Sequence, residues 1–164
     1  FISVVGAQDD SVDWTEGYTG SLTNVYIEHR QSHDKGIEGD GFNTDIGNNS
    51  DPVFWSAPTI TNLTINGLGS SNQNEAIRLR AGTRATFNNV LLEGFAEGFD
   101  LDDTETGIGV LNGETSVTDI TFNDITLTLK NDTGATFNEA DVISGIGNGT
   151  GADYNSWNSG WTRN

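Results

Sequence analysis

Two short patterns alternate along the chain, and this alternation constrains the fold more than any other feature. In the first, a small residue precedes an apolar residue, a polar residue and a core residue. It occurs at positions 11–14, 36–39, 76–79 and 98–101, with a weaker copy at 141–144. In the second, Asn or Asp precedes an apolar residue, any residue and another apolar residue. It occurs at positions 24–27, 62–65, 89–92 and 124–127. Apolar residues at alternate positions are typical of β-strands.

The spacing between the two patterns repeats. Val12 to Asn24 and Ile77 to Asn89 are both 12 positions, whereas Ile37 to Asn62 and Phe99 to Asp124 are both 25. Short strands in repeats of about 22 residues or more are typical of a solenoid that stacks one coil on the next. The sequence therefore predicts an all-β fold, a right-handed parallel β-helix of about four to five coils.

Stacked coils place equivalent residues in ladders that run along the solenoid axis. The prediction gives two inward ladders and one polar ladder at a bend. The first inward ladder contains Val12, Ile37, Ile77, Phe99 and Val142. The second contains Val25, Leu63, Val90 and Ile125, and the polar ladder contains Asn24, Asn62, Asn89 and Asp124. The additional residues of the longer coils are expected in loops.

An antiparallel β-sandwich is the competing fold, but its Asn-Gly turns should separate paired strands regularly, and they do not here. The coils are expected over residues 1–153, and the aromatic segment 154–164 is expected to cap the last coil. The first five residues have the pattern of a strand from an earlier coil, so the solenoid is expected to continue upstream of residue 1.

Composition excludes several classes of function. The net charge of −17, from 24 carboxylates and 7 Lys and Arg residues, would repel nucleic acid and anionic lipid. The same charge attracts Ca²⁺. The chain has no Cys and no apolar run long enough for a transmembrane helix. No motif for an organic cofactor is present, so Ca²⁺ is the one candidate cofactor.

Three segments resemble a group of secreted or lipoprotein-like bacterial proteins that is similar to the pectin-lyase-like β-helix superfamily. They are Asp9–Tyr18, Lys35–Asp40 and Gly160–Arg163. The resemblance implies a β-helix at the C-terminal end of a longer protein, and secretion or a place on the bacterial outer membrane or cell surface. It leaves the activity open, because the superfamily includes lyases, hydrolases, adhesins and inert spacers.

Outward residues of the first pattern form two predicted columns. One contains Asp13, Glu38, Arg78 and Asp100, and the other contains Thr15, Asp40, Arg80 and Asp102. The resemblance implies a cleft for acidic polysaccharide, with Arg78 or Arg80 as a lyase base and the carboxylates of Glu38, Asp40, Asp100 and Asp102 as ligands. The alternative is a structural charge ladder, in which an arginine held by carboxylates is a poor base.

Further candidates lie in the loops and bends. Asp100, Asp102 and Asp103 form an acidic run that could bind Ca²⁺, although the run does not match an EF-hand. Trp55 could stack on a sugar ring or pack its loop onto the coils. His29 and His33 are expected at the surface of a turn, without a third metal ligand.

Three functional hypotheses follow. The first is an extracellular or cell-surface β-helix with a binding and structural role toward glycans or calcium. The second is a polysaccharide lyase or glycoside hydrolase acting on acidic polysaccharide. The third is a filament module that associates end to end through an open N-terminal coil, where unpaired strand edges are exposed.

Overall fold

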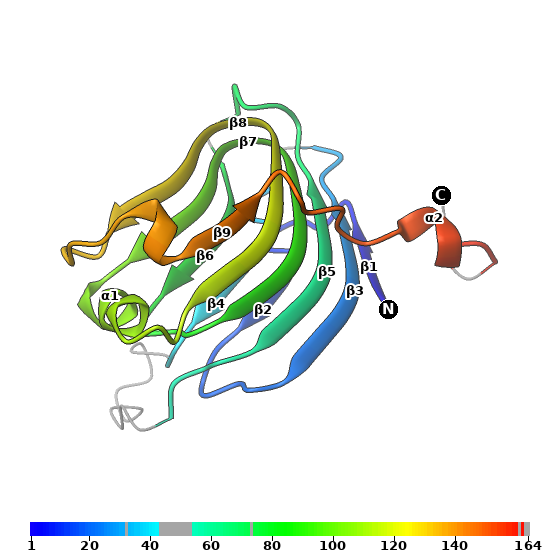
Figure 1. Cartoon of the computed structure of the whole chain (residues 1–164). Helices are drawn as coiled ribbons and strands as arrows, with labels where there is room; N and C mark the ends of the chain where they lie inside the picture. The colour runs from blue at the N-terminus through cyan, green and yellow to red at the C-terminus, as the bar shows by residue number, and fades with distance from the viewer. Residues whose placement is uncertain (32, 43–53, 73, 161, 163–164) are drawn as a thin grey trace.

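In the computed structural model of the chain, one parallel sheet curls into an open half-barrel (Figure 1). The structure describes residues 1–31, 33–42, 54–72, 74–160 and 162. Its elements are β1 (Ile2–Val5), β2 (Val12–Trp14), β3 (Ser21–Glu28), β4 (Ile37–Asp40), β5 (Thr59–Asn66), β6 (Glu75–Arg80), β7 (Thr86–Asp102), α1 (Thr104–Leu111), β8 (Ser116–Asp132), a 3-10 turn (Glu139–Asp141), β9 (Ile143–Ile146) and α2 (Tyr154–Trp157).

The strands fall into two stacks that meet in the long strands β7 and β8. β2, β4 and β6 stack with the second half of β7, whereas β1, β3 and β5 stack with its first half. β8 pairs with β7 along both halves, and β9 adds to the first half of β8. All of these pairings are parallel, as the predicted β-helix requires.

The register confirms most of the two inward ladders and corrects their ends. Val12, Ile37, Ile77 and Phe99 are successive partners, but Leu129 is next, and Val142 is not part of this ladder. Val142 instead comes just before β9, where Ile143 pairs with Val117. In the second ladder Val25, Leu63 and Val90 are partners as predicted, but Ile120 follows them and Ile125 pairs with Phe95.

Three asparagines form the predicted polar ladder. Asn24, Asn62 and Asn89 have positive φ angles of 55°, 56° and 57°, a conformation that Asn tolerates better than most residues. Asn62 Nδ2 donates to Asn24 Oδ1 and Asn89 Nδ2 donates to Asn62 Oδ1, both at 2.8 Å. Asp119 continues the ladder in place of the predicted Asp124, with a φ of 55°.

The core occupies the space inside the curled sheet. Its largest fully buried side chains include Phe87, Phe99 and Ile77. Trp14 also points inward, and its Nε1 donates to Thr83 Oγ1 at 3.0 Å. The neighbouring coil makes room for this ring through Gly39, because a Cβ at that position would lie 2.5 Å from the ring.

The aromatic C-terminal segment lies away from the position that the sequence predicted for it. Thr150 and Gly151 bond to Asn89, and the stretch that follows continues across the outer face of earlier coils. Tyr154 then stacks on Tyr26 with ring centroids 3.8 Å apart. α2 therefore lies beside β1 and the N-terminus, at the opposite end from the last coil (Figure 1).

The N-terminal end of the solenoid is hollow. A cavity of about 250 Å³ opens there, lined by Val12, Trp14, Tyr18 and Leu22 among others. Within the described residues, β1 pairs only with β3 and β2 only with β4, so each has one unpaired edge. End-to-end association through this end stays a prediction. Among the same residues, no helix has the length and apolar character needed to cross a membrane.

The asparagine ladder predicts a graded response at Asn62. Asn62→Ala should lower the free energy of unfolding by about 2–3 kcal/mol. The variant loses two side-chain hydrogen bonds, and alanine is strained at positive φ because it has a Cβ atom but no polar group to stabilise that conformation. Asn62→Gly should cost about 1 kcal/mol, because it removes the hydrogen bonds without the backbone strain. Urea unfolding measures both variants, and equal losses would contradict the strain component.

Candidate functional site

The outward side chains of β2, β4, β6 and the second halves of β7 and β8 form a charged surface, called here the ladder face. The register places Asp13, Glu38, Arg78 and Asp100 in one column, as the sequence predicted. Lys130 continues this column beyond Asp100. The sequence analysis missed Lys130, because the strand that carries it does not show the first pattern.

The two arginines of the ladder face are held by carboxylates. Arg80 Nε lies 2.7 Å from Asp40 Oδ1, and Arg80 Nη2 lies 2.9 Å from Glu38 Oε2. Arg78 bonds diagonally to Asp102 of the next coil, with Nε 2.8 Å from Oδ2. Each arginine thus has its main partners in one neighbouring coil.

These contacts hold the guanidinium groups in their charged form. The hydrogen bond that Arg80 donates to Asp40 raises the pKa of Arg80 above its ordinary value despite the opposing effect of burial, and the charges of Asp40 and Glu38 add to the rise. For Arg78, burial lowers the pKa but the bond and charge of Asp102 outweigh it. Neither group is set up to remove a proton from a substrate.

Asp100, Asp102 and Asp132 bring one carboxylate oxygen each to within 4.8 Å of the others, and are called here the Asp100 trio. Asp100 is buried, and its Oδ1 has no hydrogen-bond partner among the residues that the structure describes. Burial, together with the charge of Asp102, raises the pKa of Asp100 despite the nearby Lys130 ammonium. Lys130 Nζ lies 3.2 Å from both Asp100 Oδ2 and Asp132 Oδ2, so a cation already contacts this trio.

Asp103, the third residue of the predicted acidic metal site, is directed elsewhere. It precedes α1, and its carboxylate accepts from Thr106 N at 3.0 Å as the cap of that helix. The same carboxylate accepts from Ala81 N. Asp103 therefore ties the helix to the preceding coil, and Asp132 takes its place beside Asp100 and Asp102.

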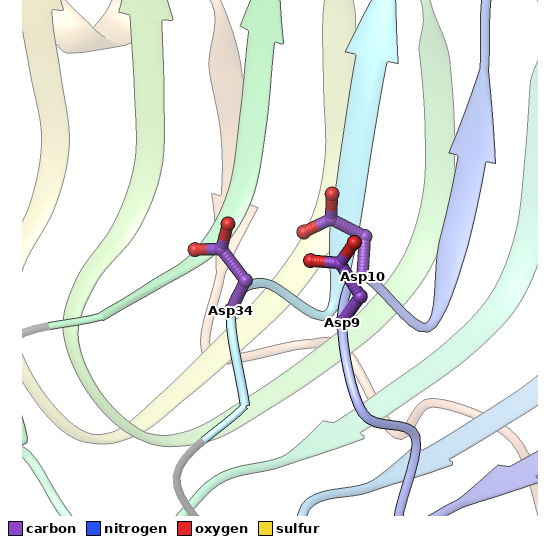
Figure 2. Close-up of side chains that lie close together, drawn as sticks. All are labelled: Asp9, Asp10 and Asp34. Carbon is purple, nitrogen blue, oxygen red and sulfur yellow. The ribbon is translucent and has the colours of Figure 1, made fainter.

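A second group, called here the Asp34 trio, lies where two coils enter the ladder face. Figure 2 shows Asp9 and Asp10, from the loop before β2, facing Asp34, from the loop before β4. One oxygen of each lies within 4.8 Å of the others. Lys35 Nζ is 2.7 Å from Asp34 and 3.8 Å from Asp10, and its side chain is only 5% exposed.

The sequence contained a signal for this second trio. Asp10 and Lys35 each stand two positions before an aligned rung of the first ladder, at Val12 and Ile37. Extending the column backwards would have placed them side by side. Lys35 N donates to Asp10 Oδ1 at 2.9 Å, as such an alignment implies. Burial nevertheless raises the pKa of Asp10 to about 6, with the bond and the charge of Lys35 acting in the opposite direction.

The other two sequence candidates are packed side chains. Trp55 lies 5.0 Å from Phe42 between ring centroids, and the Arg84 guanidinium carbon is 4.3 Å from its ring centre. The Arg84 guanidinium therefore occupies one face of the indole, so a sugar ring could not stack on that face. His29 and His33 are 5% and 4% exposed, so the expectation of surface histidines at a turn is wrong.

Comparison with known proteins identifies a family for the chain. A family model described as a pectate-lyase-like β-helix domain matches residues 1–162. No curated protein and no solved structure matches the chain.

The raised pKa of Asp10 predicts how its variant responds to pH. Between pH about 4 and 6 the folded state holds a proton that the unfolded state has released, so Asp10 makes stability fall as pH rises. Asp10→Asn keeps an oxygen for Lys35 N and removes this titration. The free energy of unfolding of the variant, relative to that of the wild type, should therefore increase as the pH rises from about 4 to about 6. Urea unfolding at several pH values measures this difference.

The control for this prediction is Asp153→Asn, whose carboxylate is exposed and lies outside both trios. It is measured at the same pH values, so that effects common to an Asp→Asn change at the surface are subtracted. A difference between Asp10→Asn and the wild type that is the same at pH 4 and pH 6.5 would contradict the assignment.

Proposed function

Because the chain belongs to the pectate-lyase-like β-helix family, we propose that it is an extracellular or cell-surface β-helix with a binding and structural role toward glycans. The observation that supports the proposal is the pairing of cationic side chains with carboxylates on the ladder face. Arg78, Arg80 and Lys130 are paired with carboxylates from neighbouring strands, and these pairs favour a rigid surface for contact with a ligand.

The same observation disfavours the lyase alternative. Lyase chemistry needs a group that takes up a proton from the substrate. The raised pKa values of Arg78 and Arg80 keep both side chains protonated, so neither can act as that base. The side chain of Arg80 is nevertheless 40% exposed, and within the described residues its hydrogen bonds come from Nε and Nη2 and leave Nη1 as a further donor. A sugar carboxylate or hydroxyl group could accept from it without disturbing Asp40.

The glycan proposal predicts binding without cleavage. The protein should bind a polyuronate such as alginate or polygalacturonate in affinity electrophoresis, and no ultraviolet absorbance of unsaturated sugar should develop. Arg80→Ala should weaken binding about tenfold, because one charge-assisted hydrogen bond contributes about 1.5–3 kcal/mol at most and screening reduces it.

Arg30→Ala is the matched control, because Arg30 is also exposed and paired with a carboxylate, Glu28, but lies off the ladder face. It should bind as the wild type does. Appearance of unsaturated product would overturn the non-catalytic proposal. If Arg80→Ala and Arg30→Ala weaken polyuronate binding equally, the ladder face is not the binding surface.

Calcium binding is a second candidate, favoured by the geometry of the Asp34 trio. Two oxygens that bind one Ca²⁺ at about 2.4 Å lie at most about 4.8 Å apart, and the three carboxylates meet this limit. Lys35 neutralises only part of the local charge, because Glu38 Oε1 also lies 3.3 Å from its ammonium. Asp9 and Asp34 are exposed and offer an ion an open approach.

The calcium candidate predicts a higher melting temperature in 10 mM Ca²⁺ than in chelator. For a weak extracellular site, the expected rise is about 3–8 °C. Asp34→Asn should remove most of the rise, and Asp153→Asn should preserve it. If Asp132→Asn removes it instead, the ion binds at the Asp100 trio, and an unchanged wild-type melting temperature would reject calcium altogether.

A further inference from the structure

We propose that His29 and His33 form a buried binding site for one late first-row divalent metal ion, of the class of Cu²⁺ and Zn²⁺. This inference is independent of the glycan and calcium proposals. The site lies at the bend after β3 and uses neither the ladder face nor the two carboxylate trios.

The separation of the two imidazoles suits a shared ion. Their ring centroids are 5.1 Å apart with an interplanar angle of 70°. Two imidazoles that bind one tetrahedral ion through nitrogen at about 2.0–2.1 Å have centroids about 5 Å apart. The observed separation of the ring centroids therefore matches the separation expected for two imidazoles on one ion.

The nitrogen atoms of this pair are buried and unpartnered. His29 Nε2, His33 Nδ1 and His33 Nε2 have no hydrogen-bond partner in the described part of the chain. A buried polar atom without a partner costs free energy, and such atoms are rare in native proteins. A metal ion would bind the lone pairs that the protein leaves unused.

The ring of His29 is already oriented as metal-binding histidines are. It hydrogen-bonds to the backbone of Lys35, and because Nε2 has no partner, this bond uses the other nitrogen. A backbone carbonyl that accepts from the second nitrogen fixes the tautomer and the ring orientation of metal ligands.

The surroundings set the class of ion. The cavity beside the pair has about 10 Å³ of space, close to the room that one water molecule needs, and Asn72 and Asn74 line it. Phe95 forms an apolar wall, with its centroid 5.3 Å from that of His29. Neutral nitrogen ligands without a carboxylate favour Cu²⁺ and Zn²⁺ over Ca²⁺ and Mg²⁺.

Simple aromatic packing is the competing explanation for the histidine pair. An edge-to-face arrangement with Phe95 would stabilise this bend equally well with two apolar rings. Apolar rings would also avoid three unpaired nitrogens in the interior. Packing therefore explains why the two rings are buried, but it does not explain why they are histidines with unpaired nitrogens among the described residues.

The test uses the whole chain, stripped with chelator and titrated with ZnCl2 or CuSO4 in calorimetry at pH 7.5. One equivalent should bind, and Cu²⁺ should show nitrogen couplings from two imidazoles in electron paramagnetic resonance. His29→Phe and His33→Phe should each lower the affinity at least about tenfold. Both variants keep an aromatic ring in the stack, and circular dichroism checks that each is folded.

Asp34→Asn is the matched control, because it removes the carboxylate of the residue that follows His33 in the chain and leaves the histidines intact. It should bind Zn²⁺ as the wild type does. If a histidine variant does not fold, imidazole nitrogen shifts in the wild type on adding Zn²⁺ provide the readout. The proposal would be overturned if the wild type binds no metal ion or if its imidazole shifts do not change. It would also be overturned if folded histidine variants still bind the ion, or if Asp34→Asn loses binding.

Discussion

The structure depends on keeping successive coils in register, and hydrogen bonds between stacked asparagine side chains make this register specific. A parallel ladder of backbone bonds alone would tolerate a shift along the strand. Asn24, Asn62 and Asn89 prevent it, because each occupies a positive-φ position and donates to or accepts from the equivalent residue of the adjacent coil. The buried aliphatic ladders and the charged columns of the ladder face follow from that alignment.

The sequence was sufficient for the fold and for most of the register, up to the coil that contains α1. There, Asp119-Ile120-Thr121 and Asp124-Ile125-Thr126 have the same pattern five residues apart, and both aspartates have positive φ. Pattern matching chose the second, because it reproduced the spacing of 25. The structure uses the first, since α1 occupies only Thr104–Leu111 before the strand begins. This misplacement also moved the predicted fifth rung from Leu129 to Val142.

The candidate sites could be predicted only where they follow from register. The column of Arg78 does so, and in the second column Asp40 and Arg80 are partners as predicted. The diagonal bond from Arg78 to Asp102 depends on side-chain conformation, which register does not determine. The burial of His29 and His33 depends on how the bend packs against Phe95, a residue more than sixty positions away. Periodicity over a few residues contains no information of that kind.

The C-terminal segment changes how the solenoid should be regarded as a mechanical object. In a simple stack of coils each unit contacts only its neighbours, and disorder can begin at either end without affecting the other. Here a strap of residues joins the last coil to the first, through Asn89, Thr64 and finally Tyr26. Within the described residues, the tail and the coil that contains Tyr26 therefore hold each other in place, so that loosening one would also loosen the other.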